Sequence, residues 1–216
     1  MAEPASPARR RQPLIVLALV AIAMAISAIR PFDWPTWWME VAPILVAAPI
    51  LIATYRRFPL TPLVYWLLLV HALILVVGAH WSYAEVPLGF WVKDWLGLDR
   101  NHYDRLGHFA QGFIPALVAR EVLLRLTPLQ RGGWLFFIVA SICLAASACY
   151  EFIEWWAAVI GGSTADAFLG SQGDIWDAQW DMFMCLCGAI LSQLLLRRWH
   201  DRQLAALTPM RDARAA

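Results

Sequence analysis

Long runs of apolar residues, separated by short polar segments, dominate the chain. We predict helices in six of these runs, near residues 13–29, 38–54, 62–79, 105–126, 133–153 and 178–197. Each run approaches the roughly 20 residues that an α-helix needs to cross the hydrocarbon core of a bilayer. The pattern therefore predicts an all-α, polytopic membrane helical bundle with about six transmembrane helices.

Two of the runs have features that change their interpretation. The run 13–29 follows three arginines at 9–11, an arrangement that also begins secretory signals. Its end at 26–28 is a poor small-x-small cleavage site, so we predict a retained anchor. The second run carries Pro43 and Pro49, which lack backbone donors and favour a kinked span or a re-entrant segment.

The distribution of arginine predicts the orientation of the helices. Arginines lie at alternate ends of the successive runs, at 9–11, 56–57, 120–131 and 197–202, whereas segment 154–177 has no Lys or Arg. Positively charged flanks stay on the cytoplasmic side, so we predict cytoplasmic termini and six crossings. Ten of the thirteen tryptophans then fall on the outer side, where indole rings favour the headgroup region.

Composition supports a membrane protein and limits the number of domains. Hydrophobic residues make up 61% of the chain, charged residues 15%, and the mean hydropathy is +0.57, all unlike a soluble domain. In 216 residues we expect one transmembrane domain at 13–199, with a basic cytoplasmic tail at 1–12 and a cytoplasmic tail at 200–216. The net charge of +1 indicates no nucleic-acid partner, and we expect membrane lipids as partners.

Polar residues gather at the predicted outer ends of the fourth and fifth helices. In NHYDRLGHFAQGF, Asp104, His108 and Gln111 are spaced i, i+4 and i+7, which places them on one helical face. In SACYEFIEWW, Glu151 and Glu154 lie about one turn apart. Both stripes can therefore point into the bundle.

The sixth helix begins with a third acidic stripe, in GDIWDAQWDM. Asp174, Asp177 and Asp181 share one face, while Trp176 and Trp180 lie on roughly the opposite side. The first two acids have an alternative role, because a carboxylate at a helix N-terminus caps it and interacts favourably with its dipole. The third lies a turn deeper, where an ionised side chain needs partners.

The three stripes together predict one outward-facing site. Carboxylates that face one another at membrane depth need a cation, shared protons or an aqueous cavity. A divalent metal ion is therefore a candidate cofactor, and zinc held by His108, Glu151 and Asp181, with His102 as a further candidate ligand, is one form of it. The predicted binding residues are Asp104, His108, Glu151, Glu154, Asp177 and Asp181.

The motifs NHYDRLGHFAQGFIPAL, YEFIEWW and GSQGDIWDAQWDM resemble those of the bacterial YjdF-like family of integral membrane proteins, over roughly residues 35–197. The resemblance implies a multi-pass protein of the bacterial cytoplasmic (inner) membrane and implies no particular reaction. More distantly, the layout is similar to VanZ-like membrane proteins, which are associated with glycopeptide-antibiotic resistance. The Lys, Gln and Asn of that layout are replaced here by Arg105, Glu154 and Cys185.

Three functions are compatible with these residues. The first is a binding protein whose site takes a cation, a lipid headgroup or another envelope ligand, or passes protons. The second is a metal-dependent envelope hydrolase or transferase, in which a metal polarises the substrate and a carboxylate acts as base. The third is a polar clamp that fixes three helices to one another. No catalytic residue is assigned, and the oligomeric state stays open.

Overall fold

The computed structural model describes residues 7–161 and 171–207, and this part of the chain contains helices and no strand. The all-α prediction is therefore confirmed. The elements are α1 (Pro7–Ser27), α2 (Trp34–Thr54), α3 (Pro62–Trp81), η1 (Tyr83–Glu85), α4 (Pro87–Leu96), α5 (Tyr103–Phe113), α6 (Pro115–Leu126), α7 (Gly133–Gly161) and α9 (Asp177–Ala205).

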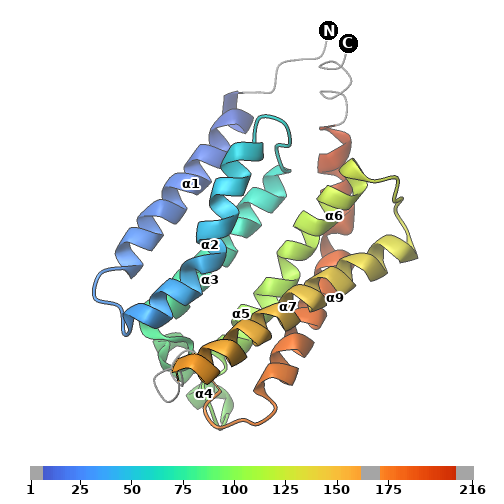
Figure 1. Cartoon of the computed structure of the whole chain (residues 1–216). Helices are drawn as coiled ribbons and strands as arrows, with labels where there is room; N and C mark the ends of the chain where they lie inside the picture. The colour runs from blue at the N-terminus through green and yellow to red at the C-terminus, as the bar shows by residue number, and fades with distance from the viewer. Residues whose placement is uncertain (1–6, 162–170, 208–216) are drawn as a thin grey trace.

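Four of the described helices, α2, α3, α7 and α9, are long and apolar enough to cross a membrane. In α1 the apolar stretch is shorter, at Arg11–Ser27. Neither α5 nor α6 has the length of a span, but α6 continues in the general direction of α5 (Figure 1). The chain is thus a multi-pass helical protein with four candidate spans.

The predicted run 105–126 is two helices and not one. Pro115 has no backbone N–H, and its ring restricts the residue before it, so the helix is interrupted at Ile114. The Ile114 N–H still bonds to the Ala110 carbonyl oxygen at 3.0 Å, which closes the last turn of α5. Pro115 then starts α6, where a missing donor costs nothing.

The second run is not interrupted by its prolines, since α2 continues through Pro43 and Pro49 as a helix of 21 residues. Its length and composition are those of a candidate membrane span, which agrees with the span rather than the re-entrant segment among the two predicted alternatives. The helix also begins earlier than the predicted 38, since Asp33 accepts a hydrogen bond from the Thr36 N–H at 2.8 Å and caps it. At the other end of the chain, α9 continues past 199 to Ala205.

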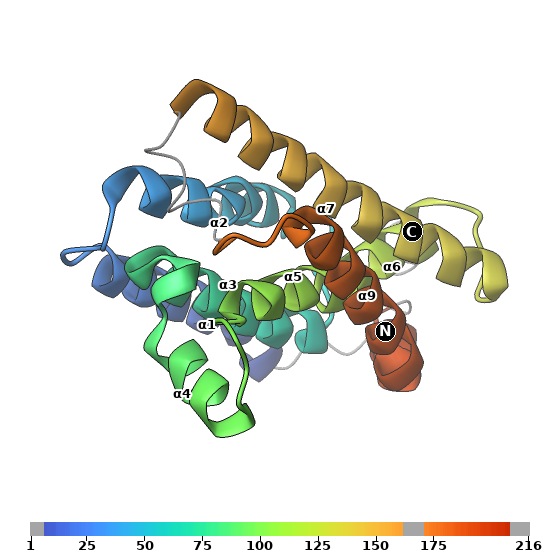
Figure 2. The same cartoon turned by 90° about the horizontal axis from the view of Figure 1, so that it is seen from below.

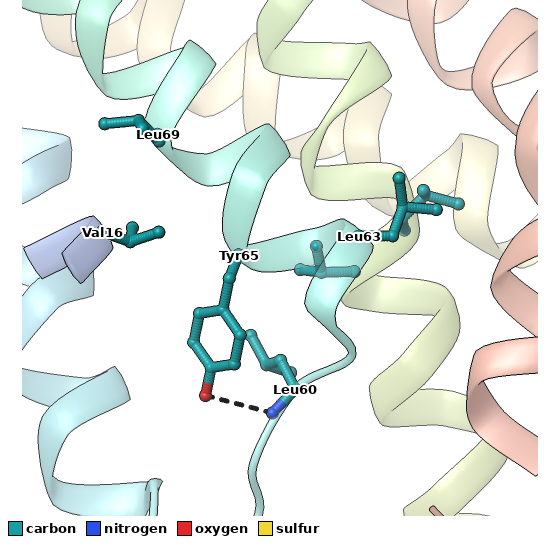
Figure 3. Close-up of a cluster of buried hydrophobic side chains, with 7 residues drawn as sticks. Val16, Leu60, Leu63, Tyr65 and Leu69 are labelled. Carbon is teal, nitrogen blue, oxygen red and sulfur yellow. Dashed lines mark hydrogen bonds between the residues drawn. The ribbon is translucent and has the colours of Figure 1, made fainter. Parts of the chain in front are cut away.

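The helices pack in two groups that meet along α3. In the first group α1 and α2 lie against α3, and in the second α5 and α7 lie against α9 (Figures 1 and 2). Figure 3 shows the cluster that Val16 of α1 forms with Leu63 and Leu69 of α3. Leu117 of α6 belongs to this cluster and is fully buried, so it joins the two groups.

Helices α5 and α9 pack backbone against backbone where they cross. A Cβ added at Gly112 would collide with the backbone carbonyl of Cys185, and one added at Gly188 would collide with the carbonyl of Phe109. Two helices can approach this closely only where neither has a side chain between them. The two glycines therefore set the distance between the helices that carry Asp104, His108 and Asp181.

Helix α4 has an apolar stripe that no other described element covers. Its members are spaced i, i+3, i+4, i+7 and i+8 and are all exposed: Leu88, Trp91, Val92, Trp95 and Leu96. Figure 2 shows α4 projecting from the side of the bundle. A helix with an uncovered apolar face, rich in tryptophan, is typical of one that lies in a membrane interface.

We predict that this stripe inserts among lipid headgroups. A spin label at Trp95→Cys should be relaxed mainly by oxygen, which concentrates in lipid, and one at Asp94→Cys mainly by a water-soluble nickel chelate. Both variants would be made without the accessible Cys149 and Cys187. Equal accessibility of the two labels to the chelate would contradict insertion.

Candidate functional site: a buried carboxylate and histidine cluster

Three titratable side chains from α5 and α9 form the centre of the candidate site. Asp104 and His108 lie one turn apart on α5 and are 8% and 5% exposed, and Asp181 of α9 is 2% exposed. One ligand atom of each lies within 4.8 Å of the other two. The helix crossing at Gly112 and Gly188 thus brings together residues more than 70 positions apart in sequence, since Asp181 follows His108 by 73 residues.

His108 lies between two carboxylates. Its Nε2 is 3.6 Å from Oδ1 of Asp104, and its Nδ1 is 3.7 Å from Oε1 of Glu151. Both distances exceed that of a direct hydrogen bond. The ring of Tyr150 lies edge-on to the imidazole, with centroids 6.3 Å apart. Each nitrogen of the imidazole therefore faces an acid at more than hydrogen-bonding distance.

Several buried polar atoms in this region have no hydrogen-bond partner among the described residues. They include Nδ1 of His108, Oε1 of Glu151 and Oδ1 of Asp181, which come from α5, α7 and α9. Buried polar atoms are paired in the great majority of cases, and leaving one unpaired costs about 1–3 kcal/mol. Unpaired atoms from three helices around one histidine are an arrangement suited to binding a cation or water.

Two arginines bind the two acids at the start of α9, Asp174 and Asp177. Arg100 bonds to Asp177 at 2.7 Å and lies 3.4 Å from Asp174, and Arg105 bonds to Asp174 at 2.7 Å. Asp174 also accepts a hydrogen bond from the Trp176 N–H at 2.9 Å, at the start of α9. The two acids are thus tied to arginines and to the helix end, and neither arginine is ion-paired with Asp181 at the centre.

Two further carboxylates approach the centre. Glu154 is half-buried on α7 and interacts electrostatically with Asp104 and Glu151. Glu40 of α2 is 5% exposed, shares a hydrogen bond with the Tyr83 side chain and interacts with Asp104. Glu40 was not predicted as a site residue, although a lone acid inside an apolar run is itself a signal of a polar site.

The remaining predicted residues lie at the edge of the site. Trp176 and Trp180 are 59% and 46% exposed, and the Arg105 guanidinium, which also bonds to Asp174, lies over the Trp180 ring at 5.2 Å. His102 precedes α5 and does not belong to the group of three ligand atoms. Burial, together with the nearby charges of Arg105 and Arg100, lowers the pKa of His102, which favours its neutral form.

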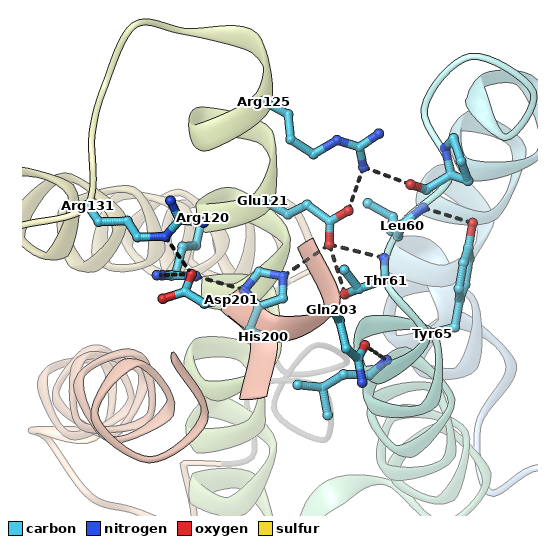
Figure 4. A network of polar contacts seen from close by, with 12 residues as sticks. Leu60, Thr61, Tyr65, Arg120, Glu121, Arg125, Arg131, His200, Asp201 and Gln203 are labelled. Atoms are coloured by element: carbon cyan, nitrogen blue, oxygen red, sulfur yellow. Dashed lines mark hydrogen bonds and ion pairs between the residues drawn. The ribbon is translucent and has the colours of Figure 1, made fainter. Parts of the chain in front are cut away.

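A second polar network lies at the other end of the bundle and was not predicted (Figure 4). The carboxylate of Glu121, fully buried on α6, accepts hydrogen bonds from the backbone and hydroxyl of Thr61 at 3.1 and 2.9 Å. His200 Nε2 lies 3.1 Å from the same carboxylate oxygen, and the other oxygen is 2.6 Å from Nη1 of Arg125. The sequence pattern indicates Arg125 only as an orientation signal and places His200 in the tail at 200–216, whereas α9 extends to Ala205.

The tautomer of His200 follows from its neighbours. Nη1 of Arg120 lies 3.1 Å from Nδ1 of His200, and a guanidinium can only donate. Nδ1 is therefore the acceptor, and Nε2–H donates to Glu121. Arg120 also donates to Asp201 at 2.8 Å. The network is fully bonded, unlike the cluster around His108, and so has the character of a structural link between α3, α6 and α9.

The fold and the cluster define a class of protein: a multi-pass helical membrane protein with a buried group of carboxylates around one histidine. A family model described as "Predicted membrane protein (DUF2238)" matches residues 12–202, and the chain belongs to this family. The chain is also similar to inner membrane protein YjdF of Escherichia coli (strain K12). The two are 52% identical over 190 residues, which cover 88% of this chain and 90% of the relative. No solved structure matches the chain.

Proposed function

We propose that this protein binds a divalent cation at the cluster of Asp104, His108 and Asp181. The observation that carries the proposal is that these buried side chains bring their ligand atoms within 4.8 Å of one another, with Oδ1 of Asp181 unpaired. Two carboxylates and an imidazole suit zinc or a similar transition metal, because magnesium and calcium prefer oxygen ligands alone.

The geometry favours Asp104 over Glu151 as the third ligand. Nε2 of His108 faces Asp104, and Nδ1 faces Glu151. If Nε2 binds the cation, Nδ1–H is left to donate to Glu151, and a carboxylate in this position commonly fixes the orientation of a metal-bound imidazole. Glu151 is then a positioning residue, and its loss should weaken binding less than the loss of Asp181.

We also propose the orientation of the site. The arginine-rich helix ends support cytoplasmic termini, and α1 begins at the same end of the bundle at which α9 finishes (Figure 1). Six crossings then require α1 and the α5–α6 pair to cross in addition to the four long helices. The relative from E. coli is named an inner membrane protein, so we propose that membrane for this chain, with the cluster at the outer surface.

One observation favours a second candidate function, a metal-dependent hydrolase or transferase. Three protein ligands leave a coordination position for water or substrate, as in catalytic zinc sites. Glu154 lies close enough to interact with Asp104 and Glu151, and is the candidate base for such a reaction. Turnover of isolated envelope lipids by the zinc-loaded protein, absent in Glu154→Gln with zinc retained, would support this function over binding alone.

The primary test is metal content. Protein purified in detergent, stripped with a chelator and dialysed against zinc should retain about one zinc ion per chain. We expect Asp181→Asn to lose this zinc, and Glu151→Gln to bind it about 10–100-fold more weakly. The matched control is Asp94→Asn, which removes an exposed acid of α4.

The metal-free Asp181→Asn variant should stay folded, because the change removes a carboxylate that repels Asp104. Zinc retention by Asp181→Asn equal to that of the wild type would contradict the proposal. Loss of folding in this variant, together with a wild type that binds no zinc, manganese or magnesium, would instead support the polar clamp.

A further inference from the structure

A cavity of about 510 Å³ opens between the α6–α7 turn and the second half of α9. Gly133, at the start of α7, is one of its lining residues. Glu151 lies 18 residues further along the same helix, which corresponds to about 27 Å of axis. The cavity is therefore at the opposite end of the bundle from the carboxylate cluster, and is independent of it.

The cavity is strongly basic. Four arginines line it, Arg120, Arg131, Arg197 and Arg198, and among the described lining residues Asp201 is the single acid. The formal charge of the lining is thus four minus one, or +3. Asp201 bonds to Nη2 of Arg120 at 2.8 Å and to Nε of Arg131 at 2.9 Å, which holds these two guanidinium groups in place. Arg197 and Arg198 are exposed beside them on α9.

The N-terminus of α7 adds backbone donors to the same cavity. The Phe136 N–H bonds to the Gly132 carbonyl oxygen at 3.1 Å, in the first turn of the helix. The N–H groups before it in this turn have no acceptor within the helix. A Cβ added at Gly133 would meet no atom within 4 Å, so the backbone is open on this side. Free amides at a positive dipole end, next to arginines, form a favourable site for a phosphate.

We propose that this cavity binds the phosphate group of an anionic phospholipid headgroup. Its volume lies in the range of sites for small organic ligands and exceeds the needs of a bare phosphate ion. Trp134 and Phe137 of α7 are 74% and 61% exposed next to it, and Leu194 and Leu195 of α9 are 54% and 63% exposed. The lipid tails can lie along these side chains while the arginines hold the headgroup.

Lipid retention by the full-length protein tests the proposal. Native mass spectrometry from a nonionic detergent would count bound phosphatidylglycerol, with phosphatidylethanolamine as the zwitterionic comparison and inorganic phosphate as competitor. We expect Arg197→Gln with Arg198→Gln to weaken phosphatidylglycerol binding about tenfold or more. The matched control, Arg11→Gln with Arg57→Gln, removes the same charge from exposed positions outside the cavity and should bind as the wild type does.

A second variant tests phosphate binding in the cavity without removing an arginine. Gly133→Asp places an acid in the first turn of α7, where the dipole favours it, so folding should persist while phosphate is repelled. Equal binding by the wild type and both cavity variants would overturn the proposal, as would an equal loss in the matched control. If the protein bound inorganic phosphate but retained no phosphatidylglycerol, and the cavity variants weakened that phosphate binding, the proposal that the phosphate belongs to a lipid would be overturned.

Discussion

Replacing Glu121 by alanine is expected to destabilise the protein by about 3–5 kcal/mol, the cost of breaking a buried ion pair by removing one partner. Glu121 is fully buried, and its carboxylate is the common acceptor for Thr61, Arg125 and His200. All of its partners are donors. Without it, the Thr61 amide N–H and the Nε2–H of His200 are left buried and unpaired, although Nδ1 of His200 still accepts from Arg120. The measurement is thermal or denaturant unfolding in detergent.

Glu121→Gln should restore little of this stability, although glutamine has nearly the shape of glutamate. Its amide nitrogen must face either Arg125 or the Thr61 and His200 donors, so at least one donor meets another donor. Arg131→Gln removes an ion pair with Asp201 in which the arginine side chain is 56% exposed, and it should change stability by less than about 1 kcal/mol. An unfolding free energy of Glu121→Ala equal to that of Arg131→Gln would contradict the structural role of the network.

A double-mutant cycle separates the pairing from the other effects of truncation. Adding Arg125→Ala to Glu121→Ala removes the cation together with its acid, so the double variant should lose less than the sum of the two single losses. Arg125 also donates to the Pro59 carbonyl at 2.7 Å and lies over the Phe58 ring. Part of the stability lost in Arg125→Ala therefore comes from these contacts, and the double variant does not regain that part.

The helical architecture could be predicted because membrane-spanning helices are visible in the sequence as long apolar runs. The predicted run 62–79 corresponds to α3, and 133–153 to the first part of α7. The interruption at Ile114 was missed because hydrophobicity continues across it, although Pro115 is a visible signal. Proline alone does not decide the outcome, since α2 continues through Pro43 and Pro49.

The carboxylate cluster could be anticipated from helical spacing, because Asp104 and His108 are one turn apart and must share a face. Spacing within one helix does not show that α5 and α9 lie close together, and the small residues Gly112 and Gly188 allow this approach. Which acids lie close together around His108 could not be read from spacing. That depends on side-chain rotamers within the packed bundle, which bring ligand atoms of Asp104 and Asp181 within 4.8 Å of each other and of the imidazole.

Polar residues on separate helices were harder to find. Glu121 and His200 are 79 positions apart. Each lies close to arginines near the end of a predicted apolar run, 105–126 or 178–197, where charged residues are ordinary. Treating residues from 200 onward as a tail hid His200, which is fully buried. A helical pattern that continues through RRWHDRQLAAL is the signal that could have placed it. Pairing across α6 and α9 still requires the fold.

Replacing Gly188 by alanine should both destabilise the protein and weaken zinc binding. The new Cβ would collide with the backbone of Phe109 and Phe113, which cannot rotate away as a side chain could. Helices α5 and α9 must therefore move apart, and overpacking of this kind costs about 1–3 kcal/mol. Since α5 carries Asp104 and α9 carries Asp181, the same movement separates two of the proposed ligands. Unfolding and retained zinc would be measured on the same preparation.

The combination of the two readouts distinguishes positioning from ligation. Gly188 has no side chain to bind a metal, so zinc loss in Gly188→Ala can arise only through the helix crossing. Gly133→Ala is the matched control, because it adds the same methyl group to a helix where nothing lies within 4 Å. It should leave both stability and zinc unchanged. A Gly188→Ala variant with wild-type stability and wild-type zinc content would contradict this prediction. It would show that zinc binding does not depend on the close approach of α5 and α9.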